Sequence, residues 1–264
     1  MLQFGGKYQG SSFLELLEVD YAQLRPDPSQ LAEGFRLSSV PHGTTVLALK
    51  YVDGVIVAGD RLATEGNRVA SRDIEKVLPT DDYSLMAIAG AAGPSLEMAR
   101  LMRVELEHYE KIEGESLELD GKANKLAQMV RSNLPAAMQG LVVVPLFAGY
   151  DLRRRTGRLW KFDVTGGRYE ETEFEATGSG GIYARESLKK GHRNDASRQE
   201  GLQAAILALV DAADEDRATG GVDLLRGIFP IVKFCSAEGI SPAEDSDIER
   251  VYREILEGRG RGGS

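Results

Sequence analysis

The sequence is poor in cysteine and histidine, and this scarcity limits the chemistry available to the protein. Cys235 is the single cysteine among 264 residues, so the chain cannot form an internal disulfide. One cysteine and three histidines also leave little material for a zinc site. We therefore expect no metal and no cofactor, and the lone thiol fits a reducing cytoplasm.

The chain also lacks an excess of positive charge and lacks long apolar runs. Lys and Arg total 32 against 41 Asp and Glu, a net charge of -9, so no basic field is available to release counterions from a nucleic acid. The longest nearly unbroken apolar stretch, residues 141–150, is far shorter than the roughly 20 residues of a membrane helix. The first twenty residues lack the basic start and apolar core of a signal peptide. We expect a cytoplasmic protein without nucleic-acid or membrane partners.

The common catalytic motifs are missing as well. A Ser-His-Asp triad needs a well-held imidazole, yet His108 lies among glutamates on a predicted helix and His192 lies in the polar stretch KKGHRND. We interpret both as solvated surface histidines. No G-x-x-x-x-G-K-[ST] motif is present, and ATGSGG lacks the lysine of a phosphate-binding loop. Nucleotide binding is therefore not supported.

What is present is an ordinary globular composition, 42% apolar and 28% charged, and a sharp change of pattern near residue 44. Residues 1–43 hold several Gly, Ser and Pro turns and read as a loosely folded extension. After them, alternation and turn chemistry predict a hairpin of strands 45–51 and 55–58. Further patterns predict strands at 84–89, 141–149, 158–164, 173–176 and 231–235, and helices from 94 to about 109, over 123–134, 183–190, 198–213 and 247–256. This order favours an α+β domain of sheets packed together with helix layers outside.

The stretch PHGTTVLALK places a glycine and two threonines directly before the first strand. One interpretation is a turn glycine followed by ordinary β formers. The other is a cleavage site at Gly43-Thr44 that makes Thr44 a new N-terminus. An N-terminal threonine needs no histidine, because its own α-amine, with an ordinary pKa of about 7.7 to 8.0, can accept the proton of its hydroxyl. A glycine before the cut leaves room for the attack.

Motifs further along the chain favour the second interpretation. GTTVLALKY is followed by VAGDRLAT, IEKV, IAGAAG, ATGSGG and DRATGG, in that order. This series, spanning about residues 43–240, resembles the β subunits of the proteasome, in particular the bacterial type found in actinobacteria. The resemblance implies a four-layer αββα sandwich, the N-terminal-nucleophile (Ntn) hydrolase fold, and a threonine endopeptidase. It also implies a propeptide over 1–43, removed by autocatalytic cleavage of the zymogen, a catalytic domain over 44–257 and a flexible tail over 258–264.

The resemblance assigns a role to each matching residue. Thr44 is the nucleophile, Lys76 is the active-site lysine with Asp60 as its acidic partner, and the Gly90 N–H is the oxyanion donor. Thr64 binds the substrate strand through its backbone. Ser179, Asp216 and Thr219 surround the new N-terminus, although the family usually has Ser where this chain has Thr219. Asp211 and Asp214 compete for the role of Asp216 and are set aside on spacing alone.

Physical roles follow from charge. The Lys76 ammonium lowers the pKa of the Thr44 hydroxyl and amine, and Asp60 keeps that ammonium charged and oriented. The alternative for Asp60 and Lys76 is a surface ion pair, which contributes little. For Gly90 the alternative is a tight strand-to-helix turn, which is compatible with an oxyanion role.

The resemblance also implies an apolar pocket for the side chain before the scissile bond. An uncharged lining disfavours charged residues by desolvation, so we expect cleavage after large apolar side chains. Simple core packing is the other interpretation of these residues. The pocket-lining residues implied are Ala63, Ile74, Leu78, Ile88, Ala92 and Leu96.

The assembly implied is a barrel with two inner homo-heptameric β rings between two outer rings of α subunits. An ATP-dependent unfoldase acts through the α rings, on proteins tagged with a ubiquitin-like modifier. Two rival interpretations stay open. One is a non-catalytic α-type ring subunit, which the GTT motif with Asp60 and Lys76 argues against. The other is the related bacterial peptidase of two six-membered rings, whose chains generally lack so long an extension.

Overall fold

Two antiparallel sheets dominate the computed structural model, which describes residues 43–65 and 68–262. The first sheet has the strand order β10-β1-β2-β11-β12, and the second has the order β5-β6-β7-β8-β9. The strands of the first sheet are β1 (Thr45–Tyr51), β2 (Gly54–Gly59), β10 (Phe174–Gly178), β11 (Ile231–Ser236) and β12 (Gly239–Pro242). Those of the second are β5 (Val77–Asp81), β6 (Ser84–Ala87), β7 (Leu146–Asp151), β8 (Thr156–Phe162) and β9 (Arg168–Glu171). A small hairpin of β3 (Ala63–Glu65) and β4 (Arg68–Ser71) stands apart from both.

The side chains of β1 alternate between the two faces of the first sheet, and both faces are buried. Successive side chains of a strand point to opposite faces, so Val46 and Ala48 share one face while Leu47 and Leu49 share the other. Val46 and Ala48 belong to an apolar cluster shared with the second sheet, whereas Leu47 and Leu49 belong to a cluster shared with helices. The predicted hairpin is confirmed, because β1 pairs with β2 along its length.

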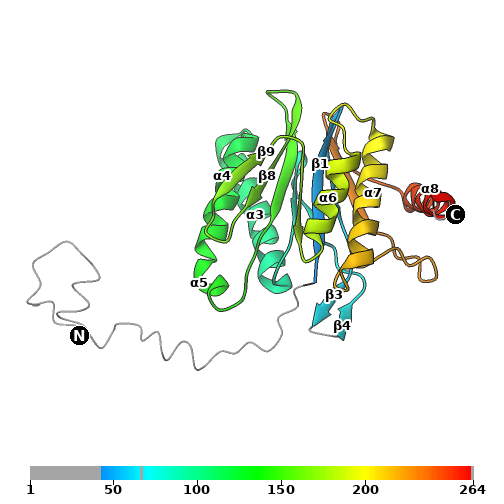
Figure 1. Ribbon diagram of the computed structural model, residues 1–264. Coiled ribbons are helices and arrows are strands. Elements are labelled where there is room, and N and C mark those ends of the chain that lie inside the picture. The colour runs from blue at the N-terminus through cyan, green and yellow to red at the C-terminus, as the bar shows by residue number, and fades with distance from the viewer. Residues whose placement is uncertain (1–42, 66–67, 263–264) are drawn as a thin grey trace, which may run out of the picture. The chain divides into compact units, whose positions relative to one another are not determined.

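Helices cover the outer face of each sheet, as Figure 1 shows. On the second sheet these are α3 (Ala92–Glu113) and α4 (Leu119–Ser132), and on the first sheet they are α6 (Gly181–Gly191) and α7 (Arg198–Glu215). The short α5 (Leu134–Ala137) follows α4, and α8 (Asp245–Gly262) packs beside α7. The layers therefore run helix, sheet, sheet, helix, which confirms the predicted four-layer αββα sandwich.

Several boundaries and short elements differ from the sequence prediction. Strand β7 begins at Leu146 rather than at 141, because residues 141–145 form only an isolated bridge between Val143 and Gly90. Helix α3 begins at Ala92, two residues before the predicted start at Pro94. The strands β3, β4, β5, β9 and β12 and the helix α5 were not predicted at all, since each is short and its pattern is weak.

The predicted flexible tail, residues 258–264, is helical in its described part. Helix α8 continues through Gly262, well past the predicted end at residue 256. Arg259 forms ion pairs with Asp211 and Asp214 of α7, and these contacts hold a glycine-rich segment in the helix. The proposed propeptide, residues 1–42, and the last two residues lie outside the described chain.

The sheet register gathers the candidate residues at one end of the sandwich. Thr45 at the start of β1 stands opposite Gly178 at the end of β10, and Val46 stands opposite Gly59 at the end of β2. Residues that precede β1 or follow β2 and β10 therefore meet, although they are far apart in the sequence. Asp60 and Ser179 are carried to Thr44 in this way.

Candidate active site

Thr44 lies directly before β1, with its hydroxyl against the peptide bond that precedes it. The side chain is buried, and Oγ1 donates a hydrogen bond of 2.6 Å to the carbonyl oxygen of Gly43. The Thr44 carbonyl is fixed by the Ser179 N–H at 2.8 Å. The hydroxyl of the candidate nucleophile thus stands beside the carbonyl group of the predicted cleavage site.

The backbone at Gly43 is packed too closely for a larger residue. A Cβ at this position would lie 2.4 Å from Thr64 Oγ1, 2.8 Å from Ala218 Cβ and 2.9 Å from the Ala218 carbonyl oxygen. Thr64 therefore reaches the residue before the candidate cleavage site with its side chain. Glycine at 43 is required by this close approach.

Asp60 and Lys76 form a fully buried ion pair beside Thr44. Asp60 follows β2 and is 0% exposed, Lys76 precedes β5 and is 2% exposed, and Lys76 Nζ lies 2.6 Å from Asp60 Oδ1. The interpretation of these residues as a surface pair is therefore wrong. Because an unpaired buried charge is strongly unfavourable, each residue depends on the other.

The Asp60 carboxylate is satisfied by backbone donors in addition to Lys76. Its Oδ1 accepts a bond of 2.8 Å from the Thr45 N–H, and its Oδ2 accepts bonds from the N–H groups of Leu62 at 2.9 Å and Gly220 at 2.8 Å. All four donors aim at an ionised carboxylate. Asp60 thereby connects the start of β1 with the loop after α7.

Lys76 Nζ is held by three oxygen acceptors. It donates to Asp60 Oδ1 and the Leu62 carbonyl, each at 2.6 Å, and to the Gly43 carbonyl at 3.4 Å. Burial lowers the pKa of Lys76, while the charge and hydrogen bond of Asp60 oppose this effect without cancelling it. Asp60 thus raises the pKa of Lys76, as expected, but burial lowers this pKa by more than Asp60 raises it.

A second polar cluster surrounds the Thr44 nitrogen. The Thr44 N–H donates to Ser179 Oγ at 3.4 Å, and Ser179 Oγ donates to Asp216 Oδ2 at 2.5 Å. Thr219 Oγ1 donates to the same oxygen at 2.6 Å, so threonine supplies the contact expected of the family's serine. Burial raises the pKa of Asp216, but the hydrogen bonds from Ser179, Thr219 and the Ala218 N–H outweigh it and the pKa is lowered.

Sequence reasoning missed the part that Thr45 plays in this cluster. Its hydroxyl shares a hydrogen bond of 2.6 Å with Thr219 Oγ1 and accepts one of 3.0 Å from the Gly180 N–H. Because Thr219 donates to the Asp216 carboxylate, Thr45 must donate to Thr219. A threonine in this strand position gave no signal, since threonine is an ordinary β former. The rival carboxylates Asp211 and Asp214 pair with Arg259 instead.

Gly90 occupies a backbone conformation that only glycine adopts readily. Its φ is +104°, and a Cβ there would lie 2.1 Å from the Val142 carbonyl oxygen. The residue lies just before α3, as a strand-to-helix turn requires. It also lines the cavity at Thr44.

That cavity holds most, but not all, of the predicted pocket residues. Its volume is about 10 Å³, roughly the space for a single water. Leu78 and Leu96 are not among its lining residues; both are partly buried against the apolar cluster of α3 and α4. Ser95, which was not predicted, does line it. The lining residues are Gly43, Thr44, Ala63, Ile74, Lys76, Ile88, Gly90, Ala92 and Ser95.

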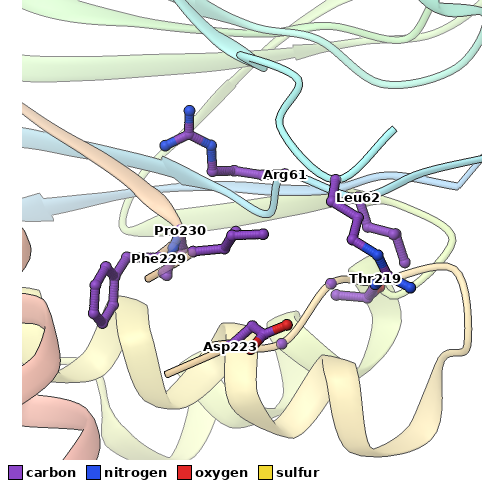
Figure 2. Close-up of a pocket in the computed structure, with 10 residues that line it drawn as sticks. Arg61, Leu62, Thr219, Asp223, Phe229 and Pro230 are labelled. Carbon is purple, nitrogen blue, oxygen red and sulfur yellow. The ribbon is translucent and has the colours of Figure 1, made fainter. Parts of the chain in front are cut away.

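A larger cavity, of about 230 Å³, adjoins the loops that follow β2 and α7 (Figure 2). Arg61, Leu62, Thr219, Asp223 and Phe229 are among the residues that line it, and Thr44 is not. Because no candidate nucleophile faces it, we assign the chemistry to the smaller cavity.

The two histidines that were predicted to be solvated, His108 and His192, differ in their environments. His108 is exposed on α3, as expected. His192 is half-buried, its Nε2 lies 2.8 Å from the Lys50 carbonyl oxygen, and its ring meets Phe174 edge-on, so the prediction of a solvated side chain was wrong for it. Neither residue belongs to the site.

The described residues offer neither a metal-binding cluster nor a membrane-spanning helix. Residues 43–65 and 68–262 contain no group of three or more His, Cys, Asp or Glu side chains placed to hold a metal ion. Among the helices in the same ranges, none combines the length and apolar character needed to cross a membrane.

Comparison with known proteins gives a consistent match. A family model described as proteasome subunit matches residues 40–224. A proteasome subunit beta of Acidimicrobium ferrooxidans is 52% identical over 93% of this chain and 89% of its own length. The corresponding proteins of Acidothermus cellulolyticus and Streptomyces griseus are 51% and 49% identical, each over 94% of this chain and over 87% and 89% of their own lengths.

Proposed function

The chain belongs to the proteasome subunit family as a catalytic β subunit, a threonine endopeptidase, and from this premise we propose that Thr44 becomes its nucleophile by self-cleavage at Gly43-Thr44. The observation that carries the proposal is the Thr44 hydroxyl, 2.6 Å from the Gly43 carbonyl oxygen and beside the buried Lys76–Asp60 pair. Residues 1–43 are then the propeptide of a zymogen.

The first reaction is intramolecular. Thr44 Oγ1 attacks the Gly43 carbonyl carbon, its proton passes to the departing Thr44 nitrogen, and the acyl group moves from nitrogen to oxygen as an ester. Water then hydrolyses the ester and releases Gly43 as a carboxylate and Thr44 as a free amine. Lys76 Nζ, 3.4 Å from the Gly43 carbonyl oxygen, stabilises the negative charge that develops there.

The second reaction repeats this chemistry on a peptide substrate. The free α-amine of Thr44 accepts the hydroxyl proton, Oγ1 attacks the substrate carbonyl, and the Gly90 N–H stabilises the oxyanion. The leaving amine takes the proton, and water hydrolyses the acyl-ester with the same amine as base. Lys76 lowers the pKa of the Thr44 hydroxyl through its charge.

The cluster of Ser179, Asp216 and Thr219 orients the amine. In the uncleaved chain the Thr44 nitrogen already donates to Ser179 Oγ at 3.4 Å, and Ser179 donates to Asp216. Cleavage converts this amide nitrogen into an ammonium or amine without moving it far. A carboxylate with a lowered pKa stays ionised near pH 7 and favours a proton on that nitrogen.

The two rival interpretations are less well supported. A non-catalytic α-type subunit has no use for a buried Lys76–Asp60 pair against a hydroxyl nucleophile. The two-ring bacterial peptidase is disfavoured because the matches to proteasome β subunits cover 93% to 94% of this chain, including much of the extension before Thr44.

Assembly and specificity extend the proposal. The chain assembles with other proteasome subunits; we propose inner heptameric β rings between α rings, in the cytoplasm, with an ATP-dependent unfoldase delivering proteins tagged with a ubiquitin-like modifier. Cleavage occurs after large apolar side chains, because Ala63, Ile74, Ile88 and Ala92 give the cavity an uncharged face. Substrate side chains widen a cavity that is small in the uncleaved chain.

A peptidase assay tests the proposed nucleophile. The chain is co-expressed with a proteasome α subunit, and fluorogenic peptides with Leu, Lys or Glu before the scissile bond are compared for the wild type and Thr44→Ala. We expect turnover of the Leu peptide by the wild type only. Turnover by Thr44→Ala refutes the nucleophile, and a preference for Lys or Glu refutes the apolar specificity.

A further inference from the structure

Ser95 carries a buried hydroxyl without a hydrogen-bond partner. It lies in the first turn of α3 and is 1% exposed, and its backbone N–H donates to the Ala91 carbonyl at 3.1 Å. Its Oγ has no partner, and within the described chain the Nε of Arg61 is the one other buried side-chain nitrogen or oxygen in this condition. Buried hydroxyls are normally paired, because leaving one unpaired costs free energy on folding.

The unpaired hydroxyl belongs to a residue that lines the candidate substrate cavity. Ser95 shares this cavity with Thr44 and Gly90, and the remaining side chains around it are apolar apart from Lys76. Lys76 is held by three acceptors and the Thr44 hydroxyl is bonded to Gly43. Ser95 is therefore the lining residue whose side-chain polar group is free to bind something that enters.

We propose that Ser95 is a specificity-determining residue, whose hydroxyl hydrogen-bonds a neutral polar atom on the substrate side chain that precedes the scissile bond. This inference rests on the proposed function of the cavity and refines it. The apolar lining favours apolar side chains and excludes charged ones, and Ser95 raises the turnover of side chains that bear a hydroxyl or amide above the level that an entirely apolar lining would allow. A site that hydrogen-bonds a substrate group discriminates against the analogue that lacks it, because the site's own polar group then stays unpaired.

The test uses pairs of peptides that differ only in a polar group. The pairs are Thr and Val, Asn and Leu, and Tyr and Phe at the position before the scissile bond, which place the polar atom at increasing distances from the backbone. The value of kcat/KM is measured for each peptide with the assembled wild-type enzyme and with Ser95→Ala. For at least one pair, we expect the polar-to-apolar ratio to fall by about three- to ten-fold in the variant, the worth of one neutral hydrogen bond.

Two further variants act as controls. Ser95→Cys keeps the approximate size of the side chain but is a weak hydrogen-bond donor, so it must lose the same ratio as Ser95→Ala. Ser187→Ala removes a buried serine of α6 that does not line the cavity, and it must leave all three ratios unchanged. Ratios that stay within about 1.5-fold of wild type in both Ser95 variants overturn the inference.

Thermal unfolding gives a second readout. Replacing an unpaired buried hydroxyl by hydrogen removes a desolvation cost, so Ser95→Ala must unfold at the same or a higher temperature than wild type. A lower unfolding temperature means that the hydroxyl is paired in the folded protein and contradicts the inference. Loss of turnover in Thr44→Ala with unchanged Ser95 ratios rejects only the role of Ser95, whereas turnover that is independent of Thr44 rejects the proposed function itself.

Discussion

Replacing Gly43 by alanine changes the residue before the proposed cut without changing the mature enzyme. In the uncleaved chain the new Cβ would lie 2.4 Å from Thr64 Oγ1 and 2.9 Å from the Ala218 carbonyl oxygen. The threonine hydroxyl can rotate away, but the Ala218 backbone cannot, so the Gly43 carbonyl must shift by roughly half an ångström to restore ordinary contact. We therefore expect a displaced scissile carbonyl.

The expected loss of self-cleavage rate follows from the precise placement of the carbonyl group that an intramolecular attack requires. A misplacement of about 1 Å costs on the order of 10²-fold in rate, so a shift of roughly half that size should slow self-cleavage by about ten-fold or more. The assay is the loss of precursor mass with time after the α and β subunits of Gly43→Ala are mixed. The double variant Gly43→Ala with Thr64→Ala removes the shortest contact but should recover little of the rate, because the clash with the Ala218 backbone stays.

The mature product supplies an internal control. Residue 43 leaves with the propeptide, so fully processed Gly43→Ala is chemically identical to the wild type and must have the same kcat/KM. Processing of Gly43→Ala at the wild-type rate would refute the close-packed geometry. A changed activity after complete processing would show that the cut is not at Gly43-Thr44.

Two substitutions test the surroundings of Thr44, and alkylation of Cys235 tests the buried core between the two sheets. Thr219→Val leaves the buried Thr45 hydroxyl without its acceptor, and urea unfolding should show a loss of about 1 to 3 kcal/mol that Thr219→Ser, which keeps the hydroxyl, does not. Asp60→Asn removes the charge that raises the pKa of Lys76, so this pKa, already lowered by burial, falls further. The ammonium then loses its proton at lower pH, and the alkaline limb of kcat/KM should move to lower pH; an unmoved limb contradicts the assignment. Burial raises the pKa of Cys235 to about 12, so iodoacetamide should leave the native thiol and the activity intact, and rapid alkylation contradicts the buried position.

The residues of the site that could be predicted from sequence are those that stand in distinctive local patterns. Thr44 follows a glycine at an abrupt strand start, and Asp60 directly follows β2, whose pairing with β1 is set by a short hairpin. The register of a hairpin follows from its turn, which is why the spacing from Thr44 to Asp60 was informative.

The residues that could not be predicted depend on contacts between distant segments. Thr45 looked like a β former, and its bond to Thr219 joins residues 174 positions apart. Ser95 looked like a helix residue, and its lack of a partner is visible only in the packed structure. The helical end of α8 has the same origin, since Arg259 meets carboxylates of α7 that the local sequence GRGRGGS does not reveal.

The most direct test of the account is the mass of the β chain in the active assembly. Wild-type chain should lose residues 1–43 and carry Thr44 at its N-terminus, while Thr44→Ala, assembled with the same α subunit, should keep its full mass. Removal of residues 1–43 from Thr44→Ala, or an active wild-type chain that begins at any other residue, would contradict the claim that Thr44 cleaves its own chain and then serves as the nucleophile.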